Sequence, residues 1–331
     1  MGTDERTTKK RLTAAATGAL RIVTDSADGI RVTARAPGKV NLTLAVGDLA
    51  ADGYHPIATT FMALDLYEDV EATEAEELSL EYLPGPFDTS RLDTGETNLA
   101  IRAARLLAEQ TGHPANVALR ITKRVPIAGG MGGGSADAAA TLVACDALWR
   151  THLTREDLCA LAAKLGSDVP FALHGGVAVG TGRGDDLTCA LVEGRFEWVL
   201  RFSAEGMSTP QTYGALDRHR LTFAEQLGPT PNPEVPEAVL TALRNSDVRL
   251  LAECLVNDLQ APALRARPEL AEALEFGETH GALAGIVSGS GPTLAFLAED
   301  AAAAAALDRA LRAEGHHTLR TRGPVPGALF T

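Results

Sequence analysis

A run of five glycines within residues 126–137 constrains this chain more than any other segment. Glycine has no Cβ, so such a run can adopt positive φ angles and point successive backbone N–H groups into one concavity. The alternating residues 117–122 predict a strand before the run, and the alanine-rich residues 138–149 predict a helix after it. Because the N-terminus of a helix attracts anions, the segment predicts a phosphate-binding loop.

This loop does not fit the two commonest phosphate-binding patterns. No Gly-Lys-Ser/Thr follows the glycines, which excludes a Walker A motif, and the chain contains no Gly-x-Gly-x-x-Gly. A flexible linker is the alternative reading of a glycine run. Linkers are mostly polar and are rarely followed at once by a long apolar helix, so the loop is favoured.

Length and charge narrow the class of protein. A chain of 331 residues can bury a sizeable core, as one large unit or as two domains that share an interface. Its 45% apolar and 22% charged residues are typical of globular proteins and argue against disorder or a fibre. A net charge of −13, with no Lys/Arg cluster after the first dozen residues, argues against nucleic acid or an anionic membrane as partner.

The four cysteines are far apart and form no Cys-x-x-Cys, which predicts reduced thiols in a cytoplasmic protein and no zinc site. No apolar run reaches the roughly 18 residues of a membrane span. The N-terminal stretch is too short and too weakly apolar for a signal peptide. We expect residues 1–28 to form a poorly ordered extension.

Hydrophobic periodicity and turn residues predict an α+β chain. The predicted strands are 31–37, 40–46, 59–73, 78–83, 117–122, 175–179, 187–192, 198–202, 283–287, 293–297 and 317–322, with Pro37 and Gly38 as a turn between the first two. The predicted helices are 96–109, 138–149, 155–165, 210–218, 236–244, 248–255, 268–279 and 300–314. From residue 268 onward the order helix, two strands, helix, strand is that of the latter part of a ferredoxin-like layer.

Three positions outside the glycine run stand out. Lys39 follows a Pro-Gly corner at the start of a strand, although a lone lysine there is more often an ordinary surface residue. Asp168 lies between a helix and a strand, with Pro170 expected to exclude helix, and it is either an Asx-turn former or a positioned base. The Asp-Gly of residues 52–55 predicts a turn, but turn chemistry does not explain the Tyr-His pair that follows it.

The blocks 37–42, 126–136 and 288–291, which occur in this order, resemble those of the GHMP kinases, the superfamily of galactokinase, homoserine kinase and mevalonate kinase. The resemblance implies a two-domain α+β fold. Residues 29–190 would form an N-terminal domain of the ribosomal-protein type with a left-handed crossover, and residues 191–331 a ferredoxin-like C-terminal domain. The active site would lie between them.

The resemblance also implies ATP-dependent phosphorylation of an alcohol. Asp168 is expected to accept the hydroxyl proton, and Lys39 to keep that carboxylate ionised and assist the developing charge. Asn41 is expected to help fix the substrate. A non-catalytic nucleotide-binding regulator on the same fold is an alternative, but such a protein would need neither Lys39 nor Asp168.

ATP is expected as co-substrate with Mg²⁺, and Ser135 is the candidate side chain near the β-phosphate or the metal. The residues that the resemblance assigns to ATP are Asn98, Lys123, Pro126, Ile127, Ala128, Gly129, Gly130, Met131, Gly132, Gly133, Gly134, Ser135 and Ala136. Two positions depart from the usual pattern. Gly38 stands where many members have alanine, and Met131 where most have leucine.

The turn 52–55 is similar to that of the branch of the superfamily whose substrate is a cytidine diphosphate-linked methylerythritol, in the non-mevalonate route to isoprenoids. That similarity implies that His55 hydrogen-bonds the cytosine and that Tyr54 and Tyr213 stack on its two faces. The residues implied at this substrate are Asn41, Tyr54, His55, Thr209, Tyr213, Ser288, Gly289, Ser290 and Gly291. Another GHMP kinase, such as homoserine kinase, is the nearest alternative, and the turn discriminates against it.

Overall fold

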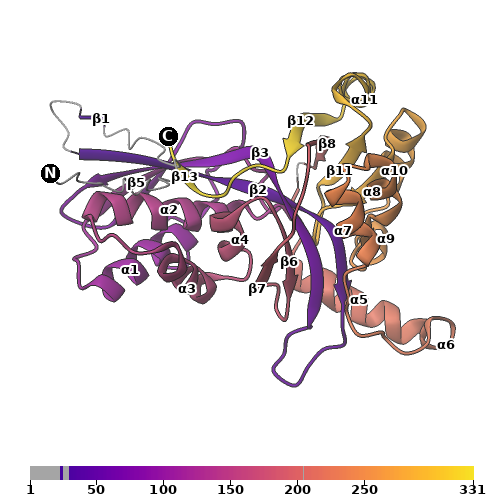
Figure 1. Ribbon diagram of the computed structural model, residues 1–331, viewed down its shortest axis with the longest axis horizontal. Helices are drawn as coiled ribbons and strands as arrows, with labels where there is room; N and C mark the ends of the chain where they lie inside the picture. Colours follow the sequence, from indigo (N-terminus) through magenta and orange to yellow (C-terminus); the bar gives the residue numbers. More distant parts are fainter. Residues whose placement is uncertain (1–22, 25–29, 204) are drawn as a thin grey trace, which may run out of the picture.

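The computed structural model describes residues 23–24, 30–203 and 205–331 (Figure 1). The expected extension of residues 1–28 lies outside the described residues except for strand β1 (Val23–Thr24), which pairs antiparallel with β2 (Ile30–Val46). No helix in the described part of the chain is both long enough and apolar enough to cross a membrane.

The first sheet is built on a long antiparallel ribbon of β2 and β3 (Ile57–Glu74). Its main path is β1-β2-β3-β5-β4, and further strands pair with β2, β3 and β6. The remaining strands of this sheet are β4 (Ser79–Leu83), β5 (Val117–Thr122), β6 (Val177–Thr181), β7 (Asp186–Cys189), β9 (Val256–Asn257) and β13 (Leu329–Phe330). The strands predicted at 59–73, 78–83 and 117–122 are confirmed.

The predicted turn at Pro37 and Gly38 is wrong, because β2 runs through this position as a single strand. The pairing with β3 shifts register between Pro37 and Lys39, which marks a β-bulge. Proline cannot donate to a sheet ladder, and a bulge is where a strand tolerates it. The Lys39 amide leaves the ladder and donates to the Met131 carbonyl over 3.0 Å. The bulge therefore ties β2 to the glycine run.

Four helices cover one face of this sheet (Figure 1): α1 (Leu99–Thr111), α2 (Gly133–Trp149), α3 (Arg155–Leu165) and α4 (Val169–His174). Helix α3 has the predicted bounds. Helix α1 begins at Leu99 and not at residue 96, because Asn98 is its N-cap and accepts a hydrogen bond from the Ala100 amide. Helix α2 begins at Gly133, five residues before its predicted start, so part of the glycine run is helical.

Helix α4 was not predicted. Pro170 was expected to prevent helix after Asp168, yet it lies in the first turn of α4. In a first turn the missing N–H has no intrahelical acceptor, so proline is compatible with it. Asp168 becomes the N-cap residue of α4.

The second sheet is antiparallel, with the order β10-β11-β8-β12. Its strands are β8 (Phe196–Phe202), β10 (Ala284–Val287), β11 (Leu294–Ala298) and β12 (His317–Gly323), and its helices are α10 (Glu269–Thr279) and α11 (Ala301–Ala313). The predicted order of helix, two strands, helix and strand is confirmed. Between β8 and β10 the chain also forms α5 (Thr209–Thr222), α6 (Ala224–Leu227), α7 (Glu237–Arg244), α8 (Val248–Cys254) and α9 (Gln260–Ala266). The sequence did not predict α6, α9, β9 or β13.

A shared core joins the two sheets. Buried side chains of β2 and β3, such as Leu42 and Met62, belong to the same apolar cluster as Trp198 of β8 and Ile286 of β10. The chain end then returns to the first sheet, where β13 pairs with β2. This core contains residues from both sides of the predicted boundary at residue 190, and the boundary itself stays a prediction.

Candidate active site

The glycine run lines a cavity of about 600 Å³ that also meets β2, α4, α5 and the loop before β11. The predicted site residues that line it are Lys39, Asn41, Asn98, Lys123, Pro126, Ile127, Ala128, Gly129, Gly130, Met131, Gly132, Gly133, Gly134, Ser135, Asp168, Thr209, Tyr213, Gly289 and Ser290. Five predicted residues are not in its wall: Tyr54, His55, Ala136, Ser288 and Gly291. The three sequence blocks thus meet at one cavity.

Positive φ angles place the glycine run against the block 288–291. Gly130 has φ +75°, and a Cβ built on it would lie 2.0 Å from the Ser288 carbonyl oxygen. Gly132 has φ +71° and is the N-cap of α2. Only glycine fits these positions without strain or collision. The first-turn amides of α2, which begins at Gly133, are then directed at the cavity with no intrahelical acceptor.

Lys39 and Asp168 come together over the start of α2. Lys39 Nζ lies 3.5 Å from Asp168 Oδ2 and donates to Asn41 Oδ1 over 2.7 Å. Asn41 in turn donates to Thr59 Oγ1 over 2.8 Å, which holds the lysine in place. The Lys39 side chain is buried, whereas that of Asp168 is 28% exposed to the cavity. Asp168 makes no side-chain capping hydrogen bond to α4, so its Asx-turn interpretation finds no support.

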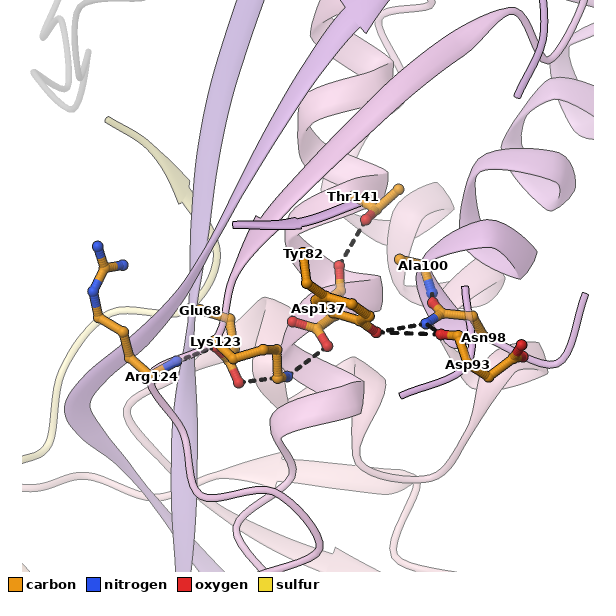
Figure 2. Close-up of polar contacts among 9 residues, drawn as sticks. All are labelled: Glu68, Tyr82, Asp93, Asn98, Ala100, Lys123, Arg124, Asp137 and Thr141. Carbon is orange, nitrogen blue, oxygen red and sulfur yellow. Dashed lines mark hydrogen bonds and ion pairs between the residues drawn. The ribbon is translucent and has the colours of Figure 1, made fainter. Parts of the chain in front are cut away.

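Behind the glycine run, Lys123 is held between two acids (Figure 2). Its ammonium lies 2.6 Å from Glu68 Oε1 and 2.6 Å from Asp137 Oδ2. Arg124 donates its amide to Glu68 Oε2 over 2.7 Å. The contact with Gly133 is close, since a Cβ there would lie 3.0 Å from Glu68 Oε1. We call Glu68, Lys123 and Asp137 the buried ion cluster.

Burial governs the protonation of this cluster. Burial raises the pKa of Glu68 to about 7, although the neighbouring Lys123 lowers it. Burial likewise raises the pKa of Asp137. Burial alone would lower the pKa of Lys123, but the charges of Asp137 and Glu68 outweigh it and raise that pKa. Two buried carboxyl groups share one cation, and the raised pKa values of both mean that the cluster favours a proton on one of them near neutral pH.

Sequence reasoning predicted Lys123 but missed both of its partners. A signal for Glu68 was present, because it occupies the inward position between Leu66 and Val70 in the two-residue period of β3. An acid in such a position needs a partner inside the protein. The signal for Asp137 was weaker, because this residue follows the glycines near a helix N-terminus, where acids are common on the surface as well.

Asn98 is already bonded within the protein. Besides capping α1, its side chain donates to the Tyr82 hydroxyl and to the Asp93 carbonyl, each over 2.7 Å (Figure 2). Burial raises the pKa of Tyr82, and the charge of Asp137 raises it further. A contact between Asn98 and ATP stays a prediction. Through its hydrogen bonds, Asn98 also helps to shape the wall of the cavity.

The residues predicted for cytosine are divided between the cavity wall and its outside. Tyr213 lines the cavity, and burial raises its pKa to about 12. His55 packs beside it, with ring centroids 5.3 Å apart. The Nδ1 of His55 lies 2.9 Å from the Gly47 carbonyl, and its Nε2 lies 3.4 Å from Asp217 Oδ2. Tyr54 is 55% exposed and lies outside the wall.

Thr209 and Ser290 also line the cavity and connect α5 to the block 288–291. Their hydroxyl oxygens lie 2.9 Å apart. Sequence reasoning missed Arg183, which also lines the cavity. Its place in the turn after β6 carried no recognisable motif.

Within the described part of the chain, no three His, Cys, Asp or Glu side chains cluster as a metal site. The donors that the cavity offers a cation are single groups, among them Asp168 and Ser135. Such a wall suits a divalent ion that arrives with most of its ligands supplied by phosphate and water, as Mg²⁺ does.

Comparison with known proteins defines the class. The family model for the GHMP kinase N-terminal domain matches residues 98–176, and the model for the C-terminal domain matches residues 239–317. A solved homoserine kinase from Cytophaga hutchinsonii has a TM-score of 0.69 over 93% of this chain and 99% of its own, at 16% identity. At that identity the likeness concerns the fold alone. Fold and domains are those of GHMP kinases.

Three further matches identify the branch of the GHMP kinases that this chain is similar to. The 4-diphosphocytidyl-2-C-methyl-D-erythritol kinase of Clavibacter michiganensis subsp. michiganensis is 59% identical over 298 residues, which cover 90% of this chain and 95% of that protein. The enzyme of the same name from Mycobacterium bovis is 50% identical over 90% of this chain and 92% of its own. A solved 4-(cytidine 5'-diphospho)-2C-methyl-D-erythritol kinase has a TM-score of 0.71 at 33% identity, over 88% of this chain and 100% of its own. The chain belongs to the 4-diphosphocytidyl-2-C-methyl-D-erythritol kinase family of GHMP kinases.

Proposed function

We propose that this chain transfers the γ-phosphoryl group of ATP to the 2-hydroxyl of 4-diphosphocytidyl-2-C-methyl-D-erythritol, in the non-mevalonate route to isoprenoid precursors. Relatives of up to 59% identity carry the name of this kinase. The observation that carries the proposal is the Lys39–Asp168 pair, which stands in the same cavity as the N-terminus of α2. An acid, a cation and free amides in one cavity are the groups that phosphoryl transfer needs.

In this proposal Asp168 accepts the proton of the substrate hydroxyl as its oxygen attacks the γ-phosphorus. Lys39, 3.5 Å from the carboxylate, keeps Asp168 ionised and offers positive charge to the transferring group. The hydrogen bond to Asn41 limits the positions that the ammonium can adopt. Alignment of the two reactants supplies much of the rate enhancement in such reactions.

The glycine run would hold the ATP phosphates by its amides. The amides of Gly133, Gly134 and Ser135 lie in the first turn of α2, where a helix attracts an anion. Ser135 is the side chain of the run that would hold Mg²⁺, and the ion would supply positive charge to the phosphates. A cytoplasmic location belongs to this proposal, because the reaction consumes ATP and the cysteines of the described chain are unpaired.

The substrate would lie at the end of the cavity that holds Thr209 and Tyr213. Tyr213 offers an aromatic face to the cytosine, and His55 supports it from behind. Homoserine kinase is the less favoured alternative, because solved structures named as homoserine kinases match this chain at 16% and 19% identity, against 33% for the cytidyl kinase. A non-catalytic nucleotide-binding regulator on the same fold is also less favoured, because it would need neither Lys39 nor Asp168, which form a pair in this cavity.

The test is a direct assay of the purified chain. ATP and Mg²⁺ are supplied with the cytidyl substrate, with homoserine or with mevalonate, and release of ADP is followed together with the mass of the product. We expect turnover with the cytidyl substrate and none with the other two. Preferred turnover of homoserine would refute the assignment. Loss of activity in Lys39→Met, with the fold intact by circular dichroism, would link turnover to this cavity.

A further inference from the structure

Asn257 joins the first sheet to the loop that carries the block 288–291. Its backbone belongs to β9, which pairs in parallel with β2. Its side-chain amide donates to the carbonyl of Val287 over 2.8 Å and to that of Gly289 over 2.7 Å. The oxygen of the same amide accepts a hydrogen bond from the Leu259 backbone over 2.9 Å. Both N–H groups and the oxygen of the side chain thus have partners inside the protein.

These hydrogen bonds lie in the interior of the protein. Asn257 is 7% exposed, whereas Val256, before it in the same strand, is 47% exposed. A buried carbonyl that loses its donor costs free energy, so the two carbonyls favour one placement of the loop. Asn257 does not itself line the cavity, so it can affect a reaction there only through the loop.

The loop that Asn257 holds lies against the Lys39 ammonium and the glycine run. Gly289 lines the cavity, and a Cβ built on it would lie 3.3 Å from Lys39 Nζ. The same Cβ would lie 3.2 Å from Asn41 Oδ1 and 3.0 Å from the Gly130 carbonyl oxygen. The residue whose carbonyl Asn257 binds is therefore in close approach to both parts of the candidate active site.

The strand that carries Asn257 is fixed to β2 by further hydrogen bonds. The Asp258 amide donates to the Leu44 carbonyl over 2.9 Å, and the Val46 amide donates to Asp258 Oδ2 over 2.8 Å. Because β2 also carries Lys39, Asn257 places the loop relative to the strand that bears the ammonium.

We propose that Asn257 is a positioning residue for the phosphoryl transfer, which holds the block 288–291 against Lys39 and the glycine run. The inference rests on the proposed function. Without the two hydrogen bonds the loop can move away, and the Lys39 ammonium gains room to leave its place 3.5 Å from Asp168. A misplacement of about 1 Å in a catalytic site can lower the rate about 100-fold.

The test measures kcat and the melting temperature of the full chain with ATP, Mg²⁺ and the cytidyl substrate. In Asn257→Ala we expect kcat to fall about 10- to 100-fold, with an unchanged circular dichroism spectrum. The matched control is Thr318→Val, which removes the hydrogen bond of another buried side chain, to Asp308. It should lower the melting temperature and leave kcat near the wild-type value, because Thr318 does not contact the loop or line the cavity.

A second variant, Asn257→Asp, keeps the shape of the side chain and the acceptor for Leu259 but has no donor when ionised. The introduced carboxyl would lie beside two carbonyl oxygens and away from water, which raises its pKa. At pH 6 its protonated form can donate to one carbonyl. The kcat of this variant, divided by that of the wild type, should therefore rise from pH 8 to pH 6, whereas the same ratio for Asn257→Ala should stay constant.

Two results would overturn the inference. Wild-type kcat in Asn257→Ala, with a melting temperature lowered as in the control, would mean that Asn257 serves stability alone. If Asn257→Ala does not fold, a ratio for Asn257→Asp that stays constant from pH 8 to pH 6 would also exclude a positioning role. Either result leaves the proposed function intact, because the wild type still turns over the cytidyl substrate. A wild-type chain without that turnover would refute the inference and the proposed function together.

Discussion

Substitution of Glu68 by glutamine offers a quantitative test of the buried ion cluster. The Glu68 side chain has no exposed surface, and burial raises its pKa from 4.5 to about 7. Below pH 4.5 this carboxyl is protonated in both folded and unfolded chains. Between pH 4.5 and 7 the unfolded chain releases the proton while the folded chain keeps it. The contribution of Glu68 to the free energy of unfolding therefore falls as the pH rises.

The size of this effect follows from the shift. A rise from 4.5 to about 7, at about 1.4 kcal/mol per pH unit, means that Glu68 lowers the free energy of unfolding by about 3 kcal/mol between pH 4.5 and 7.5. Glutamine removes this slope. It also brings an amide NH₂ toward either Lys123 or the Arg124 amide, at a cost of about 1–2 kcal/mol that does not depend on pH.

We therefore expect the stability curves of the wild type and of Glu68→Gln to cross. The variant should be less stable by about 1–2 kcal/mol at pH 4, below the pKa of Glu68 in both states, and at least as stable at pH 8. Urea unfolding at half-unit steps of pH, followed by the fluorescence of the buried Trp198, measures both curves. Parallel curves would refute the assignment. Asp137→Asn is the matched control, and if it alone flattens the curve, the proton resides on Asp137.

Three further predictions concern single residues. Lys123→Met leaves Glu68 and Asp137 buried without a cation and should lower the free energy of unfolding by about 3–5 kcal/mol at pH 8. Part of this loss should be recovered toward pH 5, and equal losses at both pH values would contradict the prediction. Asp168→Asn should lower kcat by about 10²–10⁴ with unchanged affinity for the ATP analogue, and near-normal turnover would exclude it as the base. Gly130→Ala places a methyl group 2.0 Å from the Ser288 carbonyl oxygen and should weaken ATP binding, measured by calorimetry, at least about tenfold. In Gly134→Ala the nearest neighbour of the added methyl group lies at 3.6 Å, so ATP affinity should change little.

Much of the secondary structure could be predicted from short stretches of sequence, because neighbouring residues determine it. The glycines and the alanine-rich helix after them predicted the phosphate-binding loop. The alternation of apolar and polar residues predicted most of the strands. The wrong predictions concerned proline, because the rule that proline ends a strand or a helix has permitted exceptions. Proline was read as a barrier in two places, but it lies at a bulge in β2 and in the first turn of α4.

The resemblance to GHMP kinases named residues that the structure then gathers at one cavity. Lys39 and Asp168, 129 positions apart in the chain, lie 3.5 Å from each other. No periodicity could predict that distance, because it depends on how β2 and α4 pack around α2. The resemblance also assigned Tyr54 to the base; the structure places Tyr54 outside the cavity wall, with the Arg183 guanidinium carbon 3.8 Å from its ring centre, and its contact with the base stays a prediction.

Most strands and helices and a candidate phosphate-binding loop could be predicted from the chain alone, since these rest on neighbouring residues, and the resemblance of three sequence blocks indicated the kinase class. The partners of Lys123, the return of β13 to the first sheet and the place of Arg183 were decided by the tertiary structure. These features depend on contacts between residues distant in the chain. Whether a charge is buried, and which side chain faces a cavity, is set by packing and by the loss of water that packing brings.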